Sequence, residues 1–314
     1  MIDIITYNIL SPNLCNSEEF NNYNVDDLDG KQRKSKLILL IDEWTSRENS
    51  PIICLQEVSN VWKGSLEKIF LNRNYNFFSY SYGNKKSGYF GVLTAVPRIY
   101  EVEKIEYIPI GEHIFTNEIP KNPKSFMDKW VDVFLERKEV DLVESAKERS
   151  NIAIKLALKM QKQFVIYNYH MPCAFRTPLV QTLHVDALKR LMKDHDGVPT
   201  VLTTDFNLTP DSVGYKYFTS GELPIEHMDY LINTEHINFN MESSFLVFNG
   251  KEPEFTCYSD TRWGGEFKNT LDYIFVSKHW KVLSSRLLIN TTDKMPNMMN
   301  PSDHLPMESS LEIN

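Results

Sequence analysis

Six short polar strings carry the side chains that could do chemistry, and each follows or interrupts an apolar run. They occupy residues 6–8, 55–58, 167–170, 204–207, 271–274 and 301–306. Each places a carboxylate, a carboxamide or an imidazole at or just past the end of a predicted buried strand, where sheet proteins gather functional groups into a cleft. Oxygen ligands of this kind suit a hard divalent cation such as Mg²⁺, which keeps several waters and needs only one or two carboxylates.

Asp205 and Asn207 indicate hydrolysis of a phosphodiester. They stand at alternate positions after an apolar run, so an extended backbone would direct both side chains into one cleft. Hydrolysis needs a water molecule that attacks in line, and a carboxylate beside an amide can hold and polarise that water. A histidine paired with a carboxylate, such as His304 beside Asp303 or Asp272, can donate to the phosphoryl oxygen and stabilise the developing charge.

The elements that must position these groups can be predicted from hydrophobic periodicity. Apolar residues at helical spacing, such as Leu37, Ile41 and Trp44, predict helices, and alternating or continuous apolar runs predict strands. The predicted helices cover residues 31–46, 61–71, 177–193 and 211–218, and the predicted strands cover residues 2–7, 52–55, 77–82, 91–96, 152–158, 164–169, 198–203, 271–276, 282–289 and 305–311. Strands outnumber helices and the helices fall between them, which predicts a layered α/β or α+β protein.

A single domain is expected to span residues 1–314. No low-complexity, Pro/Gly-rich or single-charge segment divides the chain, and large sandwiches reach this length. The segment around residues 121–148 has charged helical periodicity and no motif. It is therefore predicted to be a helical insertion on the surface near the cleft.

Composition limits the function classes and the compartment. The formal net charge of -8 does not favour non-specific binding to a polyanion, which argues against a simple nucleic-acid coat protein. The four cysteines are far apart and form no C-x-x-C spacing, so neither a structural zinc site nor a disulfide framework is predicted, and a reducing compartment is favoured. We see no signal peptide and no apolar run long enough for a membrane span, so we expect a soluble intracellular protein, most simply a cytoplasmic one.

All six strings, in this order, resemble the endonuclease/exonuclease/phosphatase superfamily, the metal-dependent phosphoester hydrolases that include DNase I and mRNA deadenylases. The resemblance runs from Ile2 to the last predicted strand. It implies a DNase I-like fold, in which two mixed β-sheets pack face to face as a sandwich, helices lie on the outer faces, and each half of the chain supplies one sheet. It also implies an enzyme that uses Mg²⁺, with Mn²⁺ as a substitute.

The resemblance implies a role for each matching residue around the metal and the attacking water. Glu57 matches the main metal ligand, Asn8 the residue that holds metal and phosphate side by side, and Asp303 a position on the metal side. Asp205 matches the residue that handles the nucleophile. Asn207 matches the residue that orients the nucleophile and contacts a phosphate oxygen.

Further roles concern the phosphate. Asp272 matches the carboxylate that orients a histidine, here His304, and His170 matches a position that contacts the scissile phosphate. Asn168 alternates with His170 in a predicted strand, so we predict that it also binds substrate.

Within the superfamily, the Tyr-Asn-Ile-Leu opening and the Pro-Ser-Asp-His string look most similar to the deadenylase, nocturnin and 2′-5′ phosphodiesterase branch. Phe267 stands five positions before the Asp-Tyr string, where deadenylase relatives place an aromatic ring that stacks on a nucleobase; packing of its loop on the core is the alternative. Trp263 is a second stacking candidate. Arg149 and Asn151 precede a predicted strand where relatives often place a phosphate contact, and a simple strand-start role is the alternative.

The leading hypothesis is therefore an Mg²⁺-dependent phosphodiesterase that acts on single-stranded RNA ends, as a 3′-exoribonuclease of deadenylase type. The second is a phosphatase or phosphodiesterase for a small nucleotide, for 2′-5′ oligoadenylate, or for an inositol or lipid phosphate. Two less favoured hypotheses are a DNA endonuclease and a catalytically inactive adaptor with the same fold. An acidic chain without an arginine-rich stripe fits single-stranded ends better than duplex DNA.

Overall fold

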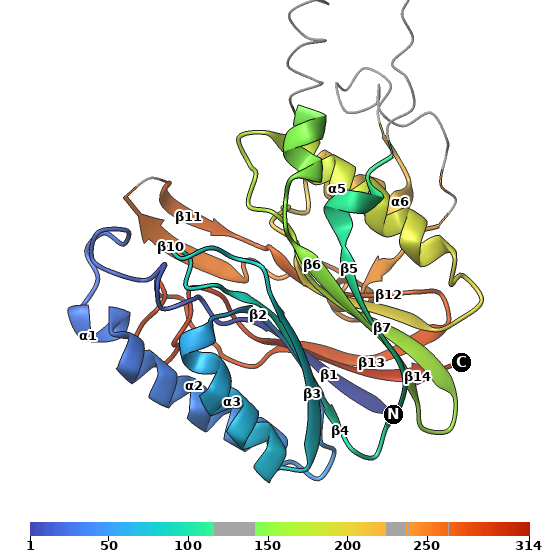
Figure 1. Ribbon diagram of the computed structural model, residues 1–314, viewed down its shortest axis with the longest axis horizontal. Helices are drawn as coiled ribbons and strands as arrows, with labels where there is room; N and C mark the ends of the chain where they lie inside the picture. The colour runs from blue at the N-terminus through green and yellow to red at the C-terminus, as the bar shows by residue number, and fades with distance from the viewer. Residues whose placement is uncertain (116–141, 224–236, 238, 263) are drawn as a thin grey trace, which may run out of the picture.

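Two six-stranded β-sheets packed face to face form the centre of the molecule (Figure 1). The structure is a computed structural model that describes residues 1–115, 142–223, 237, 239–262 and 264–314. The first sheet has the strand order β13-β14-β1-β2-β4-β3, and the second has the order β5-β6-β7-β8-β12-β9. A separate two-stranded hairpin, β10 with β11, projects beyond the sheets.

Most helices and strands lie close to their predicted ranges. The strands are β1 (Ile2–Asn8), β2 (Ile52–Val58), β3 (Tyr75–Ser81), β4 (Gly91–Pro97), β5 (Glu101–Pro109), β6 (Ile152–Lys159), β7 (Gln163–His170), β8 (Thr200–Asp205), β9 (Glu242–Ser243), β10 (Cys257–Thr261), β11 (Gly265–Asn269), β12 (Asp272–Val276), β13 (Trp280–Leu287) and β14 (Met307–Ile313). The helices are α1 (Val25–Leu28), α2 (Gly30–Thr45), α3 (Asn60–Asn72), η1 (Ile110–His113), α5 (Pro178–Lys193), α6 (Val213–Ser220) and α7 (Ser244–Asn249).

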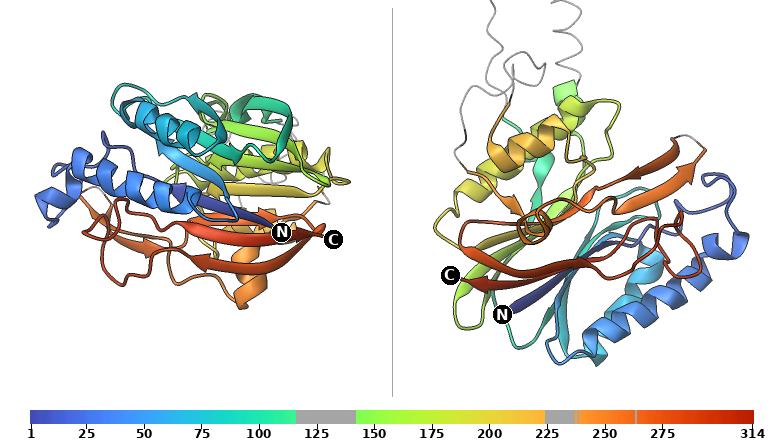
Figure 2. Two further views of the ribbon diagram at one scale, coloured as in Figure 1. Left: turned by 90° about the horizontal axis from the view of Figure 1, so that it is seen from below. Right: turned by 180° about the vertical axis from the view of Figure 1, so that it is seen from behind.

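Helices cover the outer faces of the sandwich, which gives four layers (Figure 2). Alternation along β1 explains how: Ile5 packs with Leu37 of α2 in an outer core, while Ile4 belongs to the core between the sheets. On the other side, Leu183 of α5 and Phe218 of α6 pack in the core that covers the second sheet. The predicted fold, two mixed sheets with outer helices, is confirmed.

Helix α2 shows why the sequence folds this way locally. Asp29 caps its first turn, because the Asp29 carboxylate accepts hydrogen bonds from two backbone amides that have no partner inside the helix. Leu37, Ile41 and Trp44 are buried and form the face that packs on the first sheet. The helix begins at Gly30, one residue before its predicted start.

The last strands correct one expectation, that each half of the chain supplies one sheet. β13 and β14 lie in the first sheet, where β14 pairs antiparallel with β1 from Ile2↔Leu311 to Thr6↔Met307. Since β1 is buried along most of its length, an unpaired edge here would leave backbone groups without partners, and β14 supplies them. The first sheet therefore joins the two ends of the chain.

Two expectations concern the insertion and the membrane. Of the segment expected around residues 121–148, residues 121–141 lie outside the described residues, and residues 142–147 are helical. Within the ranges that the structure describes, no helix has the length and apolar character that crossing a membrane requires.

Candidate active site

Strand register brings the polar strings to one edge of the sandwich. β1 and β2 are parallel neighbours in the first sheet, where Asn8 lies opposite Gln56. β7 and β8 are parallel neighbours in the second sheet, where His170 lies opposite Asp205. β12 runs antiparallel to β8, so its first residue, Asp272, also pairs with Asp205. Strands from both sheets thus deliver polar side chains to the same place.

Glu57 is held at this edge by an irregularity of β2. Its φ is 57°, and the register with β4 shifts between Gln56 and Val58, as in a β-bulge that re-aims a side chain. One carboxylate oxygen accepts a hydrogen bond from Asn8 Nδ2 at 3.1 Å, and the other accepts one from the Ser11 backbone N–H at 2.9 Å. The carboxylate is therefore fixed by partners on both sides.

Asp205 connects the two sheets at the site. Its Oδ2 accepts a hydrogen bond from Asn8 Nδ2 at 2.8 Å. The same oxygen lies 3.4 Å from His170 Nε2 and 3.9 Å from His304 Nε2. A buried carboxylate with an amide donor and two imidazoles around it can orient a water molecule or take up a proton.

Asp272 and His304 form a directly paired dyad. His304 Nδ1 lies 2.8 Å from Asp272 Oδ2, and the Thr256 hydroxyl donates to the same oxygen at 2.6 Å. Because a carboxylate only accepts, Nδ1 carries the proton, and the ring orientation is fixed. This leaves His304 Nε2 facing the other acidic groups.

The charges around His304 favour its imidazolium form. Burial alone would lower the pKa of His304, but the nearby acidic groups, above all Asp272, raise the pKa well above its ordinary value. A histidine that stays protonated at neutral pH can donate a hydrogen bond or a proton to a phosphoryl oxygen.

The acidic groups on the first-sheet side fit a divalent cation. Burial raises the pKa of Asp303 to about 6, and the nearby Glu57 charge adds to this effect. Asp303 Oδ1 is buried and has no hydrogen-bond partner among the described residues. A cation would satisfy this oxygen and relieve the repulsion, since hard cations prefer carboxylate and carboxamide oxygens. Glu57, Asn8 and Asp303 are the residues that would hold it.

Asn207 departs from the expected geometry, because its backbone is not extended. β8 ends at Asp205, and Asn207 has a left-handed φ of 48°. Its backbone N–H donates to Asp205 Oδ1 at 3.1 Å, and its Nδ2 donates to the Met171 carbonyl at 2.9 Å. A tight turn, rather than strand alternation, keeps Asn207 beside Asp205. Such φ values cost about 1–3 kcal/mol each and often occur at functional sites, and Leu10 and Glu57 share them here.

Asn168 does not lie where a substrate contact requires. It is fully buried between the sheets, two residues deeper along β7 than His170. Its Nδ2 donates to the backbone carbonyls of Leu55 and Leu93, and its Oδ1 accepts from Gln56 Nε2 at 2.9 Å. Asn168 therefore fastens the second sheet to the first, which favours a structural role, while the predicted substrate contact stays a prediction.

Replacing Asn168 with alanine should reduce stability rather than substrate affinity. The change removes the hydrogen bonds that two backbone carbonyls accept and one of those that Gln56 Nε2 donates, although Nε2 keeps its bond to Thr6 Oγ1. Each buried group left unsatisfied costs about 1–3 kcal/mol. Urea unfolding should show a loss of about 3 kcal/mol or more, with KM nearly unchanged in the folded fraction. His170→Ala, at the C-terminal end of the same strand, is the matched control and should lose activity with a smaller change in stability. A raised KM at unchanged stability would restore the substrate role.

Arg33 is a functional residue that the sequence reasoning missed. It is fully buried on α2, and its Nε donates to the Pro301 carbonyl at 2.6 Å. Its Nη2 donates to the carbonyls of Ile9 and Leu10, and the guanidinium lies 5.1 Å from the centre of the Trp62 ring. Arg33 thus clamps the segment after β1 to the start of the last polar string.

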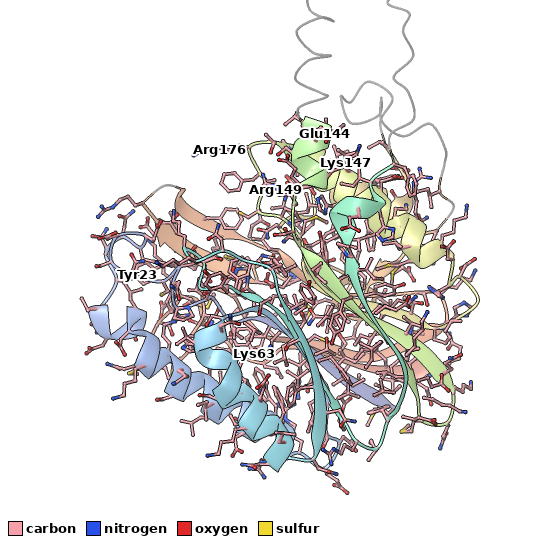
Figure 3. The ribbon with its side chains drawn as sticks, viewed as in Figure 1. Tyr23, Lys63, Glu144, Lys147, Arg149 and Arg176 are labelled. Carbon is pink, nitrogen blue, oxygen red and sulfur yellow. The ribbon has the colours of Figure 1, made fainter. Side chains whose placement is uncertain are left out.

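Three of the remaining predicted substrate contacts are described by the structure, and they lie on different elements. Arg149 is exposed beside the helical segment at residues 142–147 (Figure 3). Asn151 Nδ2 donates to the His170 carbonyl at 2.8 Å, so it supports the strand that carries this histidine. Phe267 lies on β11 and is 37% exposed. Trp263 lies outside the described residues.

Taken with its fold, this edge has the architecture of a metal-assisted phosphoester hydrolase. Residues 5–304 match the Endonuclease/Exonuclease/phosphatase family, and the chain belongs to that family of phosphoester hydrolases. Enzymes of the family are generally dependent on a divalent metal. The resemblance drawn from the six strings is thereby confirmed.

Individual relatives match smaller parts of the chain. The 2′,5′-phosphodiesterase 12 of Bos taurus is 30% identical over 127 residues, which are 38% of this chain and 20% of that protein. Nocturnin of Homo sapiens is 32% identical over 130 residues, which are 39% of this chain and 27% of that protein. The matched region thus spans about a fifth to a quarter of the length of these relatives.

Solved structures resemble the whole fold. ANGEL2, described as a 2′,3′-cyclic phosphatase, superposes with a TM-score of 0.74 at 18% identity, and the match covers 99% of this chain and 95% of that chain. The human nocturnin catalytic domain gives a TM-score of 0.63 at 18% identity, with 100% and 94% coverage. At this identity the likeness establishes the shared fold.

Proposed function

We propose that this chain is an Mg²⁺-dependent phosphodiesterase that hydrolyses RNA from single-stranded 3′ ends, as a deadenylase does. The observation that carries the proposal is the junction at Asp205, whose carboxylate meets Asn8 of the first sheet and both His170 and His304. Each of these groups comes from a different polar string, in a chain matched to a phosphoester hydrolase family over residues 5–304.

In the proposed mechanism, Asp205 accepts a proton from the attacking water. Asn8 donates to Asp205 Oδ2 and the Asn207 backbone donates to Oδ1, so both carboxylate oxygens are held in place before substrate arrives. Asn207, anchored to the Met171 carbonyl, orients the same water. Fixing the nucleophile in line with the phosphorus supplies much of the rate enhancement in phosphoryl transfer.

His304 and His170 act on the phosphate. His304, kept protonated by Asp272, donates from Nε2 to a phosphoryl oxygen as negative charge develops. His170, whose Nε2 lies 3.4 Å from the same Asp205 oxygen, contacts the scissile phosphate. Glu57, Asn8 and Asp303 would hold Mg²⁺, or Mn²⁺ in its place, and the bound cation would neutralise phosphate charge and polarise the P–O bonds.

A second candidate is hydrolysis of 2′-5′ oligoadenylate or another small nucleotide. It is favoured by the 30% identity over 127 residues to the 2′,5′-phosphodiesterase 12 of Bos taurus. Both candidate functions need the same metal and the same Asp272–His304 dyad. Residues around the site must therefore distinguish the two substrates.

A substrate panel tests the proposal. Purified protein with Mg²⁺ or Mn²⁺ should shorten poly(A) from its 3′ end faster than it cleaves other RNA homopolymers, 2′-5′ oligoadenylate, dinucleotide phosphates, plasmid DNA, an inositol phosphate or sphingomyelin. Preferred cleavage of 2′-5′ oligoadenylate would select the second candidate. Activity that is confined to plasmid DNA or to lipid and inositol phosphates would reject both.

Phe267 is proposed to form one face of a nucleobase slot. The β10–β11 hairpin that carries it is anchored, because the Tyr23 hydroxyl accepts from the Asp260 backbone N–H at 3.0 Å and Lys294 pairs with Asp260 at 2.9 Å. Phe267→Ala should therefore weaken nucleotide substrates by roughly 1–3 kcal/mol in kcat/KM, the usual value of one base–aromatic stack. The compared substrates are an oligoadenylate and bis-p-nitrophenyl phosphate, which has no nucleobase.

The control for this experiment is Phe248→Ala, which removes a ring of similar exposure, 49%, from α7. It should leave both substrates unaffected. Equal losses on both substrates in Phe267→Ala would mean that the ring packs the loop leading to Asp272 and does not bind a base.

We also propose that residues 1–314 act as one catalytic domain in the cytoplasm. The four cysteines are free in the structure, which fits a reducing compartment. The core between the sheets draws residues from both ends of the chain, which fits a single folding unit.

A further inference from the structure

Cys257 is a buried thiol at the site that the proposed mechanism does not use. It is the first residue of β10, and its backbone forms an antiparallel bridge with His304. Its Sγ, a carboxylate oxygen of Asp303 and a ring nitrogen of His304 all lie within 4.8 Å of one another. Sulfur, oxygen and nitrogen donors from three separate residues therefore meet in one place.

Two of these donors are already arranged as ligands. Asp303 Oδ1 is buried, has no hydrogen-bond partner among the described residues, and lies 3.9 Å from His304 Nε2. His304 Nδ1 is held by Asp272, which leaves Nε2 available. A carboxylate behind a histidine is the arrangement that commonly orients a zinc-binding imidazole.

The chemistry and the spacing of the set select the metal. Ligands about 2.0–2.3 Å from a tetrahedral ion lie roughly 3.3–3.8 Å from one another, so the present separations need only a small contraction. A thiolate is a poor ligand for Mg²⁺ and a good one for Zn²⁺ and related thiophilic cations. The set is thus selective against the metal that the hydrolysis uses.

We propose that Cys257, Asp303 and His304 form an inhibitory site for a thiophilic divalent cation of the Zn²⁺ class. On binding, the Cys257 thiol and Nε2 of the His304 imidazolium each lose a proton to solvent, and the metal gains bonds to sulfur, to the Asp303 carboxylate and to His304 Nε2, while Nδ1 keeps its proton toward Asp272. Inhibition follows because His304 can then no longer donate to phosphate. Only the inhibitory consequence rests on the proposed function; metal binding at these three residues does not.

Cobalt substitution tests the binding directly. Chelator-treated protein is titrated with Co²⁺, and thiolate-to-cobalt charge-transfer absorption in the near ultraviolet is recorded for the wild type, Cys257→Ser and Cys54→Ser. Cys54 is a matched control, since it is a buried thiol in the core between the sheets with threonine hydroxyls nearby. The band should appear in the wild type and in Cys54→Ser and be absent from Cys257→Ser.

Zinc inhibition tests the consequence. At saturating Mg²⁺, the Zn²⁺ concentration that halves hydrolysis should rise in Cys257→Ser by about tenfold or more, the lower end of the loss that even an outer-shell change causes at metal sites. Cys257→Ala gives the same comparison if the serine variant is unstable. The proposal would be overturned if the wild type showed no thiolate-to-cobalt absorption band, or if Zn²⁺ inhibited hydrolysis equally in all variants. A sulfur band in a protein that hydrolyses nothing in the substrate panel would instead reject the proposed function alone.

Discussion

Glu57→Ala is expected to abolish Mg²⁺-dependent hydrolysis while the protein stays folded. In the proposed mechanism Glu57 would offer the central carboxylate for the metal, and the loss of several kcal/mol of charge stabilisation corresponds to roughly a thousandfold or more in kcat/KM. Glu57 is only 9% exposed, but it belongs to no hydrophobic core cluster among the described residues. Asn8 keeps its hydrogen bond to Asp205 when the Glu57 carboxylate is removed, so the fold should survive the change. The measurements are kcat/KM on the preferred substrate of the panel and thermal unfolding of the same samples.

The matched control is Glu106→Ala, which removes a carboxylate paired with Lys155 on the second sheet, away from the site. It should retain activity. A chelator should stop the wild-type reaction without unfolding the protein, because the sheets are held by their own cores. If Glu57→Ala unfolds, the carboxylate is structural; if EDTA leaves the rate unchanged, the whole metal-assisted mechanism is wrong.

Asp272→Asn should lower kcat by about 10²–10⁴-fold, the range expected when a dyad loses its orienting carboxylate. The amide keeps the size of the side chain but cannot stabilise the protonated His304 ring. Mg²⁺ binding, measured by calorimetry, should be retained, because Asp272 faces Nδ1 of His304 and not the proposed metal ligands. An unchanged kcat would remove Asp272 from the catalytic machinery.

The pH dependence separates this role from simple destabilisation. The pKa of His304 is raised by Asp272 and the other acidic groups, so the active imidazolium should persist at neutral pH and be lost as pH rises through the raised pKa. In Asp272→Asn the main raising charge is absent, so the alkaline decline of kcat should move to lower pH. A general loss of stability would lower the rate at every pH without shifting the pH at which kcat declines.

The positions of the polar strings could be predicted from sequence because the change from an apolar run to polar residues marks the end of a buried strand. The apolar run before Glu57 and the one before Asp205 fix where two strands stop, and strand ends of a mixed sheet converge. Periodicity does not measure depth, however. Asn168 and His170 share a face of β7, yet only His170 reaches the end of the strand while Asn168 lies between the sheets.

Other features depend on contacts distant in sequence. Arg33 stands four residues before Leu37 on the buried stripe of α2, but a charge is ordinarily assigned to the solvated face. Its partners are carbonyls of two remote segments, which no local pattern reveals. The left-handed φ of Asn207 could not be predicted from sequence either, because an Asp-Phe-Asn string is compatible with a strand or a turn.

The pairing of β14 with β1 has a consequence for the order of events when the protein is made. Ile2 and Leu311 are partners, so this ladder cannot form until almost the whole chain has left the ribosome. Contacts at such separation fold slowly, because a loop of some three hundred residues must close before any pairing is gained. His304 precedes this last strand, which means that a nascent or truncated chain lacks its dyad. The proposed hydrolysis is thus expected only after the segment that carries His304 and β14 has been synthesised and has paired with β1.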